Sequence, residues 1–150
     1  LGDNFVLLIR AHYEVMKTLG IEFDNNFVFD VSNYPILNDL LIASDYLISD
    51  YSSIIFDYSI LGRPIYCFTY DEEQYYSKRG TYIKLDKELP NSVFKNEDQL
   101  LYAIKNQDYN QASKNTIKFR EKYVQFYGNA TKMTVDTIFK ELSSNEFIKK

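Results

Sequence analysis

Residues 46–68, YLISDYSSIIFDYSILGRPIYCF, decide the fold of this chain. The stretch opens with a short apolar run, Tyr46–Ile48, and closes with a second one, Ile65–Phe68. Between them we predict a helix from near Ser53 to Gly62, because glycine adopts the left-handed conformation that ends helices and the nearby proline cannot continue one. A strand, a helix and a second strand in this order predict parallel strands joined by a right-handed crossover.

The same alternation of strand and helix signals extends toward the N-terminus. Phe5–Ile9 is a continuous apolar run with β-branched members, which is typical of a strand covered on both faces. Phe27–Phe29 repeats this pattern after a polar loop. Ser32–Asn33 is then expected to cap a helix with Pro35 in its first turn. The apolar positions of that helix share one face: Ile36, Leu37, Leu40 and Leu41.

The second half of the chain is expected to be richer in helix. Asp71–Lys78 is predicted as a short helix or a loop, and Ser92–Phe94 as a last edge strand. Helices follow over Glu97–Asn106 and Asn110–Phe126. A final helix has apolar residues at helical spacing: Val135, Ile138, Phe139 and Leu142. The whole pattern predicts an α/β fold, a Rossmann-like parallel sheet flanked by helices, which 150 residues suffice to form as one domain.

Composition excludes several classes of function. A net charge of −4 with one histidine provides no basic field that would attract nucleic acid. The single cysteine, Cys67, excludes an internal disulfide and a multi-cysteine metal cluster, and its apolar surroundings predict a buried, inert thiol. No apolar stretch reaches the ~20 residues that span a bilayer. No carboxylate cluster suggests a metal site, so neither a metal ion nor another cofactor is expected. The chain opens with Leu-Gly-Asp directly before a strand-like run, so we expect it to be part of a longer protein.

Two polar groups of residues follow predicted strands, at the edge where parallel α/β sheets bind ligands. One is Ser49–Ser53, which directly precedes a predicted helix. The unpaired backbone N–H groups of a helix N-terminus attract anions, and the hydroxyls of Ser52 and Ser53 add uncharged donors for phosphate oxygens. The alternative is that these serines only cap the helix. Asp57 lies one turn deeper on the same side, either as a contact for a hydroxyl or a cation, or as a solvated helix residue.

The other group is Arg10 with His12, which share a face if the first strand continues. Arginine suits bidentate phosphate recognition, and histidine titrates near neutral pH. The alternative is a histidine with a purely structural role. Arg79 with Gly80 is a further candidate phosphate contact from a loop, although an exposed arginine before a turn would give the same local pattern.

The block Ala43–Tyr58 closely resembles the corresponding stretch of the CDP-glycerol glycerophosphotransferases, the bacterial enzymes that prime or polymerise wall teichoic acid. The resemblance covers about residues 5–90. It continues through further segments: Arg10–His12, Asp30–Tyr34, Gly62–Pro64, Phe68–Asp71 and Lys78–Tyr82.

The resemblance implies a GT-B-like enzyme of two Rossmann-like domains with the active site between them. Residues 1–150 would be the nucleotide-binding C-terminal domain, and the N-terminal domain would lie outside this chain. Position by position, the resemblance assigns the donor contacts: Arg10, Ala11 and His12 at the phosphates, Ser52 and Ser53 at the pyrophosphate, and Asp57 as a further contact.

The implied reaction transfers glycerol phosphate from CDP-glycerol to a hydroxyl of a lipid-linked acceptor and releases CMP. His12 is the candidate catalytic residue here, while a base in the absent domain would activate the hydroxyl. The chain alone is therefore expected to be inactive. The full-length protein is expected in the cytoplasm, peripheral at the inner face of the bacterial membrane.

Other functions stay open at this point. CDP-ribitol enzymes and capsule polymerases share the motif, and another GT-B glycosyltransferase with a nucleotide sugar would have a similar fold. A response-regulator-like binding module is a third class, but the Tyr-Ser-Ser sequence fits phosphate capture better than that class does. Primase or polymerase activity, the acceptor and the oligomeric state are also open.

Overall fold

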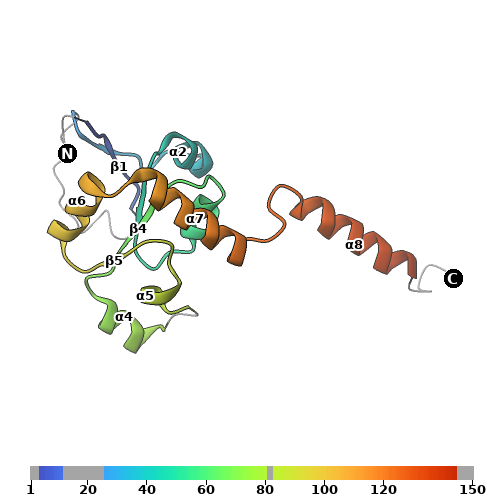
Figure 1. Ribbon diagram of the computed structural model, residues 1–150. Coiled ribbons are helices and arrows are strands. Elements are labelled where there is room, and N and C mark those ends of the chain that lie inside the picture. Colours follow the sequence, from blue (N-terminus) through green and yellow to red (C-terminus); the bar gives the residue numbers. More distant parts are fainter. Residues whose placement is uncertain (1–3, 12–25, 81–82, 145–150) are drawn as a thin grey trace. The chain divides into compact units, whose positions relative to one another are not determined.

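The computed structural model describes residues 4–11, 26–80 and 83–144 (Figure 1). The chain divides into two compact units, Leu1–Ser44 and Asp45–Lys150. Both units contain parallel strands, and helices accompany them, so the α/β class predicted from the sequence is confirmed.

The first unit contains a two-stranded parallel sheet. β1 (Leu7–Ile9) pairs with β2 (Val28–Asp30), with Leu8 opposite Phe29. Helix α2 (Leu37–Ala43) follows. β1 lies within the predicted strand Phe5–Ile9, and β2 overlaps the predicted strand Phe27–Phe29.

The start of α2 differs from its prediction. The helix begins at Leu37 with Ile36 in the cap position, so a cap at Ser32–Asn33 is wrong. The Ser32 hydroxyl instead accepts a hydrogen bond from the Ala11 backbone N–H at 3.2 Å, which holds together the loops after β1 and β2. Pro35 precedes the helix rather than lying in its first turn, because a turn closed by the Tyr34 N–H and the Val31 carbonyl comes before it and the backbone of Ile36 is extended.

The prediction that the first strand is covered on both faces is also wrong. Val6, Leu7 and Leu8 are 62%, 37% and 36% exposed. Covering both faces of a parallel strand takes helices on each side of the sheet, and the described part of this unit contains α2 alone.

The second unit contains a three-stranded parallel sheet in the order β3-β4-β5. Its strands are β3 (Leu47–Ser49), β4 (Ile65–Phe68) and β5 (Val93–Phe94). Helix α3 (Ile54–Ser59) forms the crossover from β3 to β4, and Gly62 after it adopts φ +66°, as predicted. β5 lies at the edge of the sheet, also as predicted.

Five further helices complete the described chain: α4 (Glu72–Lys78), α5 (Leu85–Glu88), α6 (Glu97–Asn106), α7 (Tyr109–Tyr123) and α8 (Ala130–Ser144). The bounds of α6 match the prediction, whereas α7 ends three residues earlier than predicted. The sequence analysis missed α5, because four residues are too few to show a helical period.

The core of the second unit lies around α3, β4 and α7, and α3 and α7 lie side by side (Figure 1). Phe56 of α3 stacks on Phe119 of α7 with ring centroids 5.3 Å apart. Tyr58 of α3 and Tyr66 of β4 are fully buried in the same core. Cys67 is a free, buried cysteine, and burial, with the nearby Asp50 charge, raises the pKa of its thiol to about 12. The predicted burial of Cys67 is therefore confirmed, and a raised thiol pKa disfavours the reactive thiolate.

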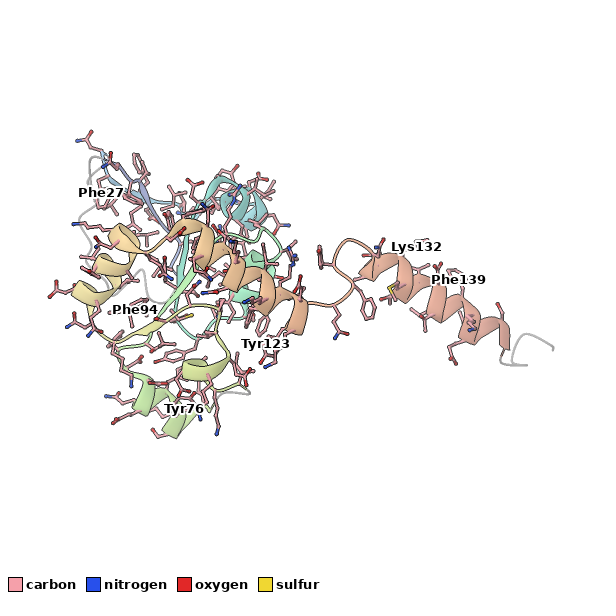
Figure 2. The ribbon with its side chains drawn as sticks, in the orientation of Figure 1. Phe27, Tyr76, Phe94, Tyr123, Lys132 and Phe139 are labelled. Carbon is pink, nitrogen blue, oxygen red and sulfur yellow. The ribbon has the colours of Figure 1, made fainter. Side chains whose placement is uncertain are left out.

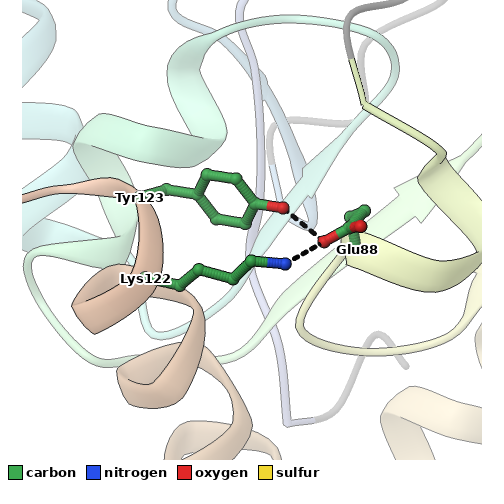
Figure 3. Close-up of polar contacts among 3 residues, drawn as sticks. All are labelled: Glu88, Lys122 and Tyr123. Carbon is green, nitrogen blue, oxygen red and sulfur yellow. Dashed lines mark hydrogen bonds and ion pairs between the residues drawn. The ribbon is translucent and has the colours of Figure 1, made fainter.

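An ionic contact joins α5 to α7 (Figure 3). The Glu88 carboxylate accepts hydrogen bonds from the Lys122 ammonium and the Tyr123 hydroxyl. These two donors, in that order, lower the pKa of Glu88. The contact fixes the short helix that the sequence did not reveal.

The apolar positions predicted for the final helix lie in α8, and Phe139 is labelled in Figure 2. All four are exposed: Val135 by 43%, Ile138 by 51%, Phe139 by 65% and Leu142 by 51%. None of the helices in the described ranges is long and apolar enough to cross a membrane.

Candidate functional site

The carboxyl ends of β3, β4 and β5 meet at one edge of the sheet. Ser49 pairs with Cys67, and Phe68 pairs with Phe94, so the residues that follow each strand emerge together. Neighbouring strands in a sheet are about 4.8 Å apart. This edge is where open parallel sheets bind ligands, and it carries the candidate residues of Ser49–Ser53.

Ser52 and Ser53 lie between β3 and α3 and are both exposed. Ser53 occupies the cap position of α3, but its side chain makes no capping hydrogen bond. Ser52 Oγ accepts a hydrogen bond from the Ile54 N–H at 3.4 Å, which is long for such a bond. Capping therefore engages only one of the two hydroxyls, and weakly.

Tyr51, which the sequence analysis did not single out, ties this segment to the next strand end. Its hydroxyl donates a hydrogen bond to Asp71 Oδ1 at 2.9 Å. Its ring stacks on Tyr75 of α4 with centroids 3.7 Å apart and planes 14° from parallel. Burial, followed by the hydrogen bond to Asp71, raises the pKa of Tyr51. A tyrosine next to the serine pair and an aspartate after the next strand were the signals that could have revealed this contact.

The remaining candidates in the second unit are exposed. Asp57 lies in the first turn of α3 with its carboxylate open to a hydroxyl or a cation. Arg79 follows the last residue of α4, and its backbone N–H donates to the Tyr75 carbonyl at 2.9 Å. Gly80 adopts φ +69°, a conformation that favours glycine, so the pair forms a turn with an exposed guanidinium.

A hollow of about 470 Å³ lies at the carboxyl ends of β4 and β5. Tyr70 on its rim is 72% exposed. Lys95 pairs with Glu72 at 2.6 Å, which raises the pKa of the Lys95 ammonium. The hollow is lined by aromatic and polar side chains: Phe68, Tyr70, Lys95, Asn96, Glu97 and Asp98.

Arg10 and Ala11 belong to the first unit, where the loop after β2 holds them. The exposed Arg10 guanidinium donates to the Tyr34 carbonyl oxygen at 2.6 Å. The Ala11 N–H donates to Ser32 Oγ, as described above. His12 lies outside the described residues.

The side chains that the structure describes include Cys67 and most of the aspartates and glutamates. No group of three or more histidine, cysteine, aspartate or glutamate residues among them could hold a metal ion. The candidate residues of each unit offer hydroxyl, backbone amide or arginine N–H donors, which proteins use for phosphate oxygens.

Comparison with known proteins gives consistent results. The family model of CDP-Glycerol:Poly(glycerophosphate) glycerophosphotransferase matches residues 1–140. The chain is 36% identical to the teichoic acid poly(glycerol phosphate) polymerase of Staphylococcus epidermidis, over 95% of this chain and 20% of that protein. It is also 36% identical to the teichoic acid glycerol-phosphate transferase of Staphylococcus aureus, over 93% of this chain and 36% of that protein.

Solved structures of the wall teichoic acid polymerase TagF have the same fold. A structure of TagF soaked with CDPG superposes with a TM-score of 0.78 at 35% identity, and the match covers 95% of this chain and 37% of that one. The chain thus spans between about a fifth and just over a third of the length of these relatives.

Proposed function

The chain belongs to the CDP-glycerol:poly(glycerophosphate) glycerophosphotransferase family, and from this premise we propose that it is the donor-binding, C-terminal part of a two-domain transferase. The enzyme moves glycerol phosphate from CDP-glycerol to a lipid-linked teichoic acid acceptor and releases CMP. The family match over residues 1–140 carries this proposal. The exposed serine hydroxyls at the carboxyl edge of the sheet support it.

The donor pyrophosphate binds at Ser52 and Ser53 in this proposal. Both side chains are exposed, and Ser53 is not used as a helix cap, so the hydroxyls are open to phosphate oxygens. Hydrogen bonds to a charged group are worth about 1.5–3 kcal/mol each. Asp57 would accept a hydrogen bond from a donor hydroxyl, and Arg79 with Gly80 would be a further phosphate contact.

Arg10, Ala11 and His12 are proposed as further contacts of the donor phosphates, as the family resemblance implies. The hydrogen bond to the Tyr34 carbonyl orients the Arg10 guanidinium and leaves its other N–H groups for phosphate oxygens. A phosphate contact at the Ala11 amide requires that N–H to be shared with Ser32. His12 is proposed as the catalytic residue of this chain, placed at the phosphates of the donor.

The chemistry is a displacement at phosphorus. The acceptor hydroxyl oxygen attacks the phosphorus that carries glycerol, the bond from that phosphorus to the CMP oxygen breaks, and CMP leaves. The hydroxyl proton passes to a base that the N-terminal domain supplies. Arg10, His12 and the serine pair stabilise the negative charge on the phosphates and the leaving group. This chain alone is therefore expected to bind the donor and to transfer nothing.

Thermal unfolding of the chain with different nucleotides tests the proposal. A ligand that binds the native state and not the unfolded chain stabilises the protein by RT ln(1 + [L]/Kd), so it raises the melting temperature with its concentration and affinity. CDP-glycerol and CMP should raise it, while UDP and UDP-linked sugars should not. Protection by UDP alone would instead indicate a glycosyltransferase that uses a nucleotide sugar, and CDP-ribitol in the same series separates a ribitol from a glycerol donor.

The acceptor and the cellular location are parts of the same proposal. A lipid-linked acceptor places the full-length protein at the cytoplasmic face of the membrane as a peripheral protein. Co-sedimentation of the full-length protein with membrane vesicles, and its release by salt or mild alkali, would support this location. Recovery of all the protein in the supernatant without such treatment would contradict it.

A further inference from the structure

Tyr51, Asp71 and Tyr75 form a contact cluster, the Tyr51 cluster, beside the proposed pyrophosphate site. Tyr51 directly precedes the serine pair, whereas the other two residues belong to α4 and the residue before it. The Tyr51 hydroxyl donates to Asp71 at 2.9 Å, and its ring stacks on Tyr75 at 3.7 Å. One side chain therefore fixes the segment after β3 through both a polar and an aromatic contact.

The partners of Tyr51 are themselves held in place. The Asp71 carbonyl accepts the Tyr75 N–H at 3.0 Å, so both partners belong to one helical turn. The next residue, Glu72, pairs with Lys95 directly after β5 at 2.6 Å. Helix α4, which Tyr51 contacts, therefore also forms an ion pair with the residue that follows β5.

The serine pair has weaker local support of its own. Ser53 makes no side-chain cap bond, and the bond from Ile54 N–H to Ser52 Oγ is 3.4 Å long. The hydrogen bond from the Tyr51 hydroxyl to Asp71 is shorter, at 2.9 Å, and it reaches the residue before α4. The position of the two hydroxyls at the sheet edge thus depends on the residue that precedes them.

We propose that Tyr51 is a positioning residue, which through its contacts with Asp71 and Tyr75 holds the segment of Ser52 and Ser53 in the geometry that binds the donor pyrophosphate. The inference rests on the proposed function and adds a residue that acts through the serine pair without touching the donor. Packing alone would require only the ring, whereas positioning requires the hydroxyl and an oxygen at position 71 that accepts its hydrogen bond. A phenol is protonated at neutral pH even at its ordinary pKa of about 10, and burial raises the pKa of Tyr51 further, so the hydroxyl is a hydrogen-bond donor.

Steady-state kinetics of the full-length transferase, with CDP-glycerol as the varied substrate, tests the inference through three variants. Tyr51→Phe keeps the ring and removes the hydroxyl, and Asp71→Ala removes the acceptor. Each should raise KM for CDP-glycerol about two- to tenfold, the effect of one hydrogen bond, with little change in kcat. Asp71→Asn should stay near wild type, because its amide oxygen still accepts the bond. Tyr76→Phe, an exposed neighbour on α4 outside the cluster, is the matched control and should leave KM unchanged.

Hydrogen exchange of the Ser52–Ile54 amides in the 150-residue chain gives an independent measurement. Exchange should be faster in Tyr51→Phe and in Asp71→Ala, and near wild type in Asp71→Asn. The inference is overturned if replacing both serines by alanine raises KM while Tyr51→Phe leaves KM unchanged. That result leaves the proposed function intact. A loss in Asp71→Asn as large as in Asp71→Ala also overturns it. If the wild type does not use CDP-glycerol, the proposed function is wrong, and unaltered exchange in Tyr51→Phe then rejects the positioning role as well.

Discussion

Replacing both serines of the proposed pyrophosphate site separates binding from capping. In the variant with Ser52→Ala and Ser53→Ala, the fold should lose little, because Ser53 makes no capping bond and Ser52 makes one bond of 3.4 Å. Losing a full cap costs about 1 kcal/mol, so the free energy of unfolding should fall by less than that. Two lost hydrogen bonds to a charged pyrophosphate should weaken binding by about 3 kcal/mol or more, a ratio of roughly 100 in Kd.

Calorimetric titration of the chain with CDP-glycerol measures the Kd, and a denaturant unfolding curve measures the free energy of unfolding. Ser77→Ala is the matched control, because Ser77 is an exposed serine whose hydroxyl bonds to the Gln74 carbonyl within α4. It should change neither the Kd nor, beyond a few tenths of a kcal/mol, the stability. An unchanged Kd in the double variant, together with a clear loss of stability, would refute the proposed phosphate role and leave capping as the function of these serines.

Three further outcomes follow from named residues. CDP-glycerol affinity should fall between pH 5.5 and 8.5 as His12 loses its proton, because the cationic imidazole attracts phosphate. His12→Ala should make the affinity independent of pH over this range, and parallel pH profiles for the wild type and the variant would show that His12 does not contact the donor. Glu88→Gln should lower the melting temperature at pH 7 but not at strongly acidic pH. Because the pKa of Glu88 is lowered in the fold, the stability that its carboxylate contributes is complete above the ordinary pKa of 4.5 and is lost as the pH falls through the folded pKa. Gly62→Ala should destabilise the chain by about 1–2 kcal/mol in a denaturant curve, since φ is +66° and a Cβ would lie 3.1 Å from Ile117. The loss should exceed that of Gly128→Ala, where φ is +80° but no heavy atom lies within 4 Å of the new Cβ, and equal losses would show that packing against Ile117 is irrelevant.

The sequence alone determined the order of most elements and the family. Apolar runs and the Gly62 stop signal located β3, α3 and β4, because strand and helix periods and the left-handed cap are local properties of the chain. The motif Ala43–Tyr58 resembled one family, and the family model that matches residues 1–140 confirms it. The serine pair was also visible, since a strand followed by hydroxyls and a helix is a local pattern.

The tertiary structure decided what each polar side chain does. Ser32 was predicted as a helix cap, yet its hydroxyl bonds to an amide 21 residues away, at Ala11. No contact was predicted for Tyr51. Its partner Asp71 is 20 residues away in the chain but lies after the neighbouring strand in the fold. A hydroxyl has several acceptors and donors within reach of any short segment. Which of them it uses depends on the strand pairing that brings distant loops together, and no local period encodes that choice.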